Sequence, residues 1–159
     1  MAKIKRSQIK HFLNTTPDST ATYSLINEGV TTGTVNYNPQ TTEETYIAED
    51  NASIYVERYA PNLPIEATAN SGDAVFEFVD GLRVDRAVLD DAETDMVTVY
   101  LYKTPTGDAY PAEKQDVSIQ IDSFGGDGGV GAKINYTINF IGDPVPGLFD
   151  PDTKAFTPS

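Results

Sequence analysis

The segment that most constrains the fold is residues 123–147, SFGGDGGVGAKINYTINFIGDPVPG. Seven of its first nine residues are Gly, Ser or Asp, a composition typical of a flexible hairpin tip. From Lys133 to Phe140, polar residues then alternate strictly with apolar ones, which predicts a strand with one polar and one packed face. Residues 115–122 alternate in the same way on the other side of the loop, so we expect an antiparallel hairpin.

The rest of the chain predicts a mainly β protein, a β-sandwich or barrel flanked by one short α-helix. We expect two strands within residues 20–38, a long hairpin over 38–64 with its tip at Asp50-Asn51, and a strand over 96–103. The helix is predicted over 73–83, where Val75, Val79 and Leu82 recur at helical spacing and Ser71 could form the N-cap.

Both ends of the chain are interpreted as extended arms of one domain spanning 1–159. Residues 1–19 contain few apolar side chains, and residues 141–159 contain four prolines, which we expect to exclude regular structure. The second segment nevertheless carries apolar residues at intervals, so we predict that it lies on another surface.

Charge is distributed unevenly along a chain whose net charge is −13. Residues 1–10 hold four of the 11 basic residues, and all 24 acidic residues lie beyond them. Such a basic segment could dock on an acidic neighbour, including another copy of the chain, whereas the acidic remainder disfavours nucleic-acid recognition. There is no cysteine, signal peptide or apolar run of about 18 residues, so we expect a soluble protein made in the cytoplasm.

Motifs for catalysis or phosphate binding are incomplete. The glycine loop has its lysine, Lys133, one place too late for a phosphate-binding loop, and no hydroxyl residue follows. His11 is the only histidine and lies in the basic arm, away from any acid or nucleophile in the sequence. We therefore predict no enzyme activity and no cofactor. The enzyme alternative is a small β-fold hydrolase, which a lone histidine in a mobile arm disfavours.

A binding module is the alternative that the residues leave open. Asp91, Glu93 and Asp95 have calcium-loop spacing, but Met96 stands where glycine is needed and Tyr102 where a glutamate is needed. The absence of tryptophan disfavours a sugar-stacking platform, although tyrosines could replace it. The alternative function is thus a non-catalytic carbohydrate- or calcium-binding β-sandwich of a baseplate or adhesin, and we predict no metal site.

Three stretches carry a resemblance to a known family: EETYIAEDNA, SGDAVFEFVDGLR and GDPVPGLFD. With their surroundings, from about residue 37 to 158, they resemble the tail tube (major tail) proteins of tailed bacteriophages infecting Gram-positive bacteria. The resemblance implies a β-sandwich with one flanking helix, of which six copies close into a ring around a lumen. Rings would stack into the tube through which DNA passes during ejection.

The resemblance also implies partners and a location. Besides itself, the protein would contact an initiator or baseplate protein, a terminator and a tape measure protein, with double-stranded DNA in transit but not specifically bound, and no membrane. It would be assembled in the host cytoplasm and reside in the virion. The long segment 38–64 would be a stacking element, and the glycine loop a tip at the rim of a ring.

Two sets of site residues follow from the resemblance. The expected lumen-facing residues are Ser118, Gln120, Asp122, Lys133, Asn135, Thr137 and Asn139. The expected contacts between subunits or rings are Lys3, Lys5, Arg6, Phe12, Glu43, Glu44, Tyr46, Asp50, Tyr55, Arg58, Phe149 and Phe156. Two alternatives remain for the first set: its face is outer surface, or Lys133 pairs with Asp122 across the hairpin.

Overall fold

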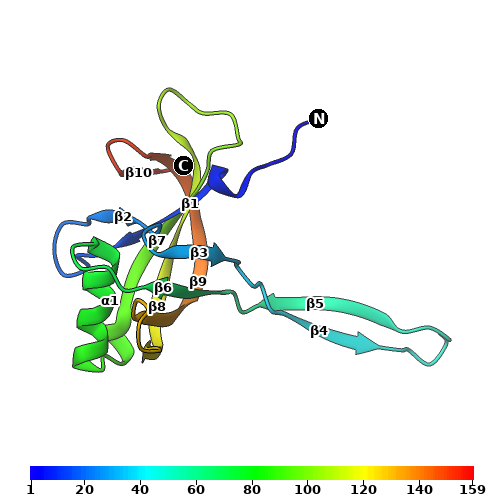
Figure 1. Cartoon of the computed structure of the whole chain (residues 1–159). Coiled ribbons are helices and arrows are strands. Elements are labelled where there is room, and N and C mark those ends of the chain that lie inside the picture. The colour runs from blue at the N-terminus through cyan, green and yellow to red at the C-terminus, as the bar shows by residue number, and fades with distance from the viewer.

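The computed structural model describes all 159 residues and contains one large sheet, one α-helix and one separate hairpin. The strands of the large sheet follow the order β2-β1-β7-β8-β9-β6-β3, all antiparallel, with β10 paired to β9. These strands are β1 (Ile9–Asn14), β2 (Tyr23–Leu25), β3 (Val30–Gly33), β6 (Asn62–Thr68), β7 (Glu93–Tyr100), β8 (Tyr110–Gly125), β9 (Lys133–Asp150) and β10 (Ala155–Pro158). The hairpin, β4 (Pro39–Glu44) and β5 (Ser53–Tyr59), projects away from the body (Figure 1). Two short 3₁₀ turns, Arg6–Gln8 and Leu89–Ala92, complete the chain.

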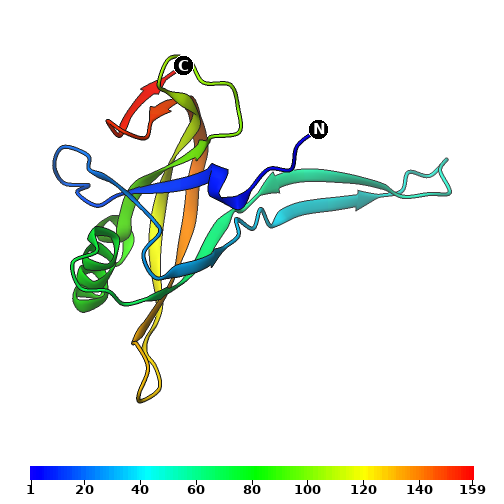
Figure 2. The ribbon, with the colours of Figure 1, turned by 45° about the horizontal axis from the view of Figure 1, so that its top comes forward.

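The predicted hairpin around the glycine loop is confirmed and forms the centre of the sheet. β8 and β9 pair antiparallel from Gly125↔Lys133 to Tyr110↔Phe149, far beyond the expected 115–122 and 133–140. Gly125 and Gly126 take φ values of 137° and 135° at the turn, a region that side chains other than glycine rarely adopt. Figure 2 shows the tip of this hairpin protruding from the end of the sheet.

Helix α1 (Ala74–Asp85) confirms the predicted helix, beginning one residue later and ending two residues later than expected. The N-cap is Asp73 rather than Ser71, because the Asp73 carboxylate accepts a hydrogen bond from the Phe76 amide at 3.1 Å. The helix ends at Arg86, which takes a left-handed conformation with φ 48°. Val75 and Val79 are buried against the sheet, and their packing holds the helix on one of its faces.

The core consists of two clusters that lie on opposite faces of the sheet. The first lies beneath α1 and includes Leu63, Met96, Ile119, Ile134, Tyr136 and Ile138. The second contains Phe12, Tyr23, Val97, Val99, Ala112 and Phe149. Met96 and Val97 belong to different clusters because successive strand residues point to opposite faces. The rings of Phe12 and Phe149 lie 4.8 Å apart although β1 and β9 are not neighbours in the sheet, so the sheet curls to bring them together.

The interpretation of residues 1–19 as an arm is wrong from Ile9 onward. β1 pairs with both β2 and β7, and its last four residues, His11 to Asn14, are buried. Two adjacent apolar residues, Phe12 and Leu13, show no strand or helix periodicity in the sequence, yet each contributes its side chain to a different core cluster. The exposed basic segment is therefore confined to residues 1–7.

The expectation that prolines exclude regular structure from 141–159 is also wrong. β9 continues through Pro144 and Pro146 to Asp150, and β10 pairs with it. These prolines are tolerated because β6 pairs only with residues 133–139 and β10 only with 147–150, with single backbone hydrogen bonds at Phe140 and at the carbonyl oxygen of Pro146, which leaves 141–145 open on one side. Pro64 likewise lies inside β6, opposite Thr137, rather than marking the end of the long hairpin.

Candidate functional site

The structure gathers all seven expected lumen residues on one face of β8 and β9. The register places Ser118 opposite Asn139, and Gln120 opposite Thr137. A register shift between Ile121 and Ser123 then brings Ser123 opposite Asn135. Because alternate residues of paired strands share a face, these polar side chains form one continuous surface.

Hydrogen bonds connect this polar face across the strands. Thr137 Oγ1 donates to Asp122 Oδ2 at 2.8 Å, and Gln120 Nε2 donates to Asp122 Oδ1 at 2.6 Å. Asn139 Nδ2 donates to Gln120 Oε1 at 3.3 Å, which continues the chain along β9. The Asp122 carboxylate is thus occupied on both oxygens, and the polar side chains are held in place by one another.

Lys133 does not pair with Asp122. Its Nζ donates to Thr68 Oγ1 on β6 at 2.8 Å, because β6 lies on the other side of β9 and Thr68 is directly opposite Lys133. The polar face therefore extends over a third strand, whose outward residues alternate with buried Leu63, Ile65 and Ala67. The outward polar residues that sequence reasoning missed are Asn62, Glu66 and Thr68, and Pro64 lies among them on the same face. The alternation in NLPIEAT was the signal that could have identified them.

The opposite side of the same three strands is apolar and covered by α1. Ile134, Tyr136 and Ile138 are buried there and pack in one cluster with Val75 and Val79. Burial, together with the nearby Asp73, raises the pKa of the Tyr136 hydroxyl. Of the two faces of β6, β8 and β9, only the polar one is free of the helix.

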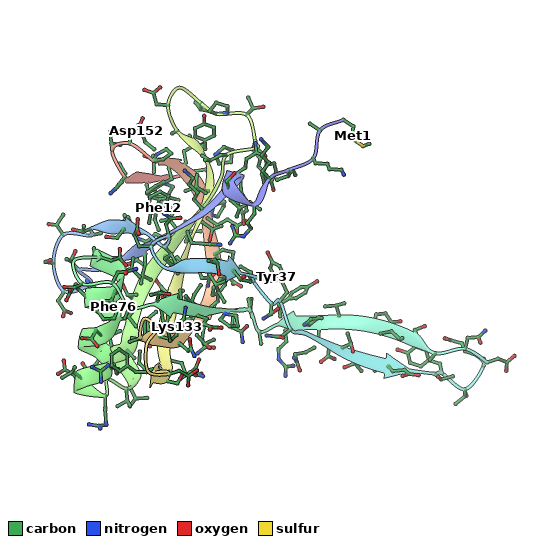
Figure 3. All side chains as sticks on the ribbon, viewed as in Figure 1. Met1, Phe12, Tyr37, Phe76, Lys133 and Asp152 are labelled. Atoms are coloured by element: carbon green, nitrogen blue, oxygen red, sulfur yellow. The ribbon has the colours of Figure 1, made fainter.

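The hairpin of β4 and β5 is a second candidate surface, because it carries apolar side chains that nothing in the chain covers (Figure 3). Ile47 is fully exposed and Ile54 is 68% exposed. The remaining exposed apolar residues of this hairpin are Tyr46, Tyr55, Val56 and Tyr59. At its base, the rings of Tyr37 and Tyr59 pack edge to face at 6.3 Å. A two-stranded hairpin alone is only marginally stable in water, so a partner is expected to cover it.

Of the expected contact residues, most lie at the surface but two do not. Phe12 and Phe149 are 3% and 0% exposed and pack on each other in the second core cluster, so the expectation that they contact another subunit is wrong. Phe156 is half-buried against the same cluster. The other exposed members are Lys3, Lys5, Arg6, Glu43, Glu44, Tyr46, Asp50, Tyr55 and Arg58.

His11 lies in the buried part of β1, where it connects the basic segment to the sheet. Its Nε2 is 3.1 Å from Arg6 Nη2, and its Nδ1 is 3.0 Å from Thr98 Oγ1. Since arginine can only donate, Nε2 accepts and Nδ1–H donates to Thr98, which fixes a neutral imidazole. Burial first and Arg6 second lower the pKa of His11 to about 4. The same Arg6 bonds the carbonyl oxygens of Gly33 at 3.2 Å and Ile9 at 2.6 Å.

The calcium-loop spacing gains no geometric support from the structure. Asp95 accepts hydrogen bonds from Tyr23 Oη and Asn14 Nδ2, so both of its oxygens are used within the chain. No three His, Cys, Asp or Glu side chains come together in a group suited to a metal ion. No helix has the length and apolarity needed to cross a membrane.

Comparison with known proteins identifies the fold. No protein-family model matches the sequence, and no curated protein matches it. Among solved structures, the chain is similar to a chain from the tail of an empty GTA particle, computed with helical refinement and C6 symmetry. The TM-score is 0.64 at 11% identity, and the match covers 98% of this chain and 99% of that one. The chain therefore shares the fold of that tail chain, mainly β with one helix, as the sequence predicted.

Proposed function

We propose that this protein is the structural subunit of a phage tail tube, which polymerises as stacked hexameric rings. The observation that carries the proposal is the fold similarity to a C6-symmetric tail over nearly the whole of both chains. The sequence resemblance to tail tube proteins points to the same role, and infection of a Gram-positive host stays a prediction of that resemblance.

The polar face of β6, β8 and β9 is proposed to line the channel. Its opposite side is filled by α1, which suits the outer side of a ring. Its one cation among the expected lumen residues, Lys133, is hydrogen-bonded to Thr68, whereas Asp122 and Glu66 contribute negative charge. Since double-stranded DNA carries about one negative charge per 1.7 Å, such a wall would not hold it, and the genome could slide past.

Assembly is supported by surfaces that a single copy leaves unfinished. β2 and β3 lie at the two margins of the large sheet, and each has a neighbouring strand on one side only. Open strand edges are hidden in most proteins, and a ring of identical subunits can hide them by joining each copy to the next. The β4–β5 hairpin is proposed as the element that joins successive rings.

The other partners are proposed from the sequence resemblance. They are an initiator or baseplate protein, a terminator and a tape measure protein, with assembly in the host cytoplasm and final residence in the virion. Double-stranded DNA would be in transit without specific binding.

Negative-stain electron microscopy of the concentrated protein tests the proposal. Hollow tubes, or rings whose end-on averages have six-fold symmetry, are expected. Compact monomers at every concentration and salt condition, without rings or tubes even after addition of an initiator complex, would contradict it.

A further inference from the structure

The tip of the β4–β5 hairpin combines exposed apolar side chains with uncompensated negative charge. Between Gln40 and Glu57 the chain contains the acidic residues Glu43, Glu44, Glu49 and Asp50 and no basic residue. None of these four carboxylates takes part in a salt bridge. The fully exposed Ile47 lies among them, so the natural partner of this tip is an apolar surface bordered by cations.

One groove of the chain has an apolar lining bordered by cations. It follows the seam between β3 and the start of β1, which lies beyond β2 because β2 pairs only with residues 12–14 of β1. Arg6 bridges this seam by hydrogen bonds to the carbonyl oxygens of Gly33 and Ile9. We call it the seam groove; its volume is about 440 Å³. Its apolar lining residues are Ile9, Leu25, Ile26, Val30 and Ile65, and its charged ones are Arg6 and Lys10, with no acidic residue.

The cations at the seam groove are unpaired. Lys10 lines the groove, and Lys3 and Lys5 belong to the exposed segment that leads into it. The chain has two salt bridges, Arg58–Glu57 and Arg83–Asp80, and neither involves these lysines. They are therefore available to carboxylates of another molecule.

Two other grooves match the acidic tip less well. The groove at the base of the hairpin is lined by three acidic residues, Glu57, Glu113 and Asp143, which would repel the tip, and by one cation, Arg58, which already pairs with Glu57 at 3.9 Å. The groove between α1 and β8 is lined by Arg83 and Arg86 and by no acidic residue. The Arg83 guanidinium already pairs with Asp80 at 2.8 Å and stacks over the Phe124 ring, and Arg86 belongs to a segment, residues 85–91, that also carries Asp85, Asp90 and Asp91.

We propose that the hairpin tip of one copy docks in the seam groove of a second copy, with Ile47 entering the groove and the tip carboxylates facing Lys5 and Lys10. This inference rests on the proposed function and names the receiving surface of the hairpin. The hairpin tip does not reach the seam groove of its own chain, because the hairpin points away from the body in both views (Figures 1 and 2). Tip and groove are different surfaces, so the contact is head to tail and can propagate from ring to ring.

Charge reversal tests the contact. Lys5→Glu with Lys10→Glu reverses the groove, and Glu43→Lys with Asp50→Lys reverses the tip. We expect each pair to abolish long tubes in electron micrographs while six-fold rings persist, and all four substitutions in one chain to restore tubes. Lys103→Glu with Lys154→Glu, which changes the net charge as much as the groove pair, is the control and should leave tubes unchanged.

Normal tubes from either reversed pair would overturn the proposal. So would loss of tubes from Arg86→Glu, in the groove between α1 and β8, when the lysine variants form normal tubes. If the lysine variants form normal tubes but no longer bind duplex DNA, the basic segment is a nucleic-acid tail and not part of a docking surface.

Cross-linking decides the contact even if no tubes form. The chain contains no cysteine, so Ile47→Cys with Ser7→Cys places one thiol at the tip and one at the groove lining. Mild oxidation should give a ladder of disulfide-linked copies on a non-reducing gel, and Ile47→Cys with Ser19→Cys should not. Equal ladders, or none in the first variant, would overturn the docking proposal, whereas a ladder without rings or tubes would preserve it and refute the tail-tube function.

Discussion

Gly147 offers a direct test of how the C-terminal segment is attached to the sheet. It lies in β9 opposite Pro158 of β10, and it is buried. A Cβ atom at this position would overlap the carbonyl oxygen of Thr157 and come within 2.7 Å of Phe156 Cζ. Gly147→Ala therefore forces β10 away from β9, for a steric reason and not because of its backbone φ.

The expected loss of stability can be bounded from these contacts. Overpacking by one methyl group typically costs about 1–3 kcal/mol. The decrease in the free energy of unfolding cannot exceed the stabilisation that β10 provides, because β10 can detach from β9. Detachment exposes the half-buried Phe156, which costs about 1 kcal/mol, and breaks the few β9–β10 hydrogen bonds, which contribute about 0.5–1.5 kcal/mol each. We expect a decrease in the free energy of unfolding of about 2 kcal/mol, or a Tm lower by about 4–8 °C in a chain of this size.

Two assays separate local detachment from global unfolding. Urea titration gives the free energy of unfolding, and tryptic cleavage after Lys154, in the turn before β10, reports local opening. Cleavage should accelerate well below the unfolding midpoint. Gly128→Ala is the matched control, because its φ is not positive and no atom lies within 4 Å of the added methyl group. Unchanged stability and unchanged cleavage in Gly147→Ala would refute the placement of β10.

Three further predictions concern the core, the buried histidine and the channel. Ile138→Ala should lower the free energy of unfolding by about 2–5 kcal/mol, whereas Asn139→Ala, on the polar face, should lower it by less than about 1 kcal/mol; equal values in chemical denaturation would contradict the face assignment. Because the pKa of His11 is about 4 when folded and 6.5 when unfolded, the unfolded state binds its proton first as the pH falls, so stability should decrease from pH 6.5 to 4 by up to about 3 kcal/mol. His11→Gln should flatten that slope between pH 6.5 and 5, where most carboxylates remain ionised, and an unchanged slope in urea titrations would contradict it. Gln120→Lys should slow DNA ejection from particles carrying the variant, measured by release of a DNA-binding dye, and ejection at the normal rate would place this residue outside the channel.

The alternating strands could be predicted from the sequence because their environment is regular. Residues 133–140 have one face under a helix and one polar face, so the period of two survives intact. Helix α1 was predictable for the same reason, since Val75 and Val79 repeat on its packed side.

The ends of the chain could not be predicted, because their structure depends on distant partners. β1 is short and buried on both faces, so Phe12 and Leu13 show no alternation. Pro144 and Pro146 look incompatible with a strand until the sheet order reveals that β9 lacks a second neighbour there. The hydrogen bonds of Gln115 also depend on residues distant in the sequence. Its Nε2 donates to the carbonyl oxygens of Ile141 and Gly142, at 2.6 and 2.9 Å, where the register between β8 and β9 shifts.

The candidate site was predictable as a set of faces but not as a network. Alternation alone placed Gln120 and Thr137 on the polar side. Sequence could not show that Lys133 bonds to Thr68, because the two residues are 65 positions apart and meet only through the pairing of β6 with β9.

The central claim, that the polar face of β6, β8 and β9 lines a channel, is tested most directly by thiol labelling of assembled tubes. Gln120→Cys places a thiol on the polar face, and Asp85→Cys places one at the exposed end of α1. The account predicts that a small maleimide labels both variants, whereas a maleimide attached to a large protein labels only Asp85→Cys in tubes and both variants in dissociated protein. Rapid labelling of Gln120→Cys along intact tubes by the large reagent would contradict it.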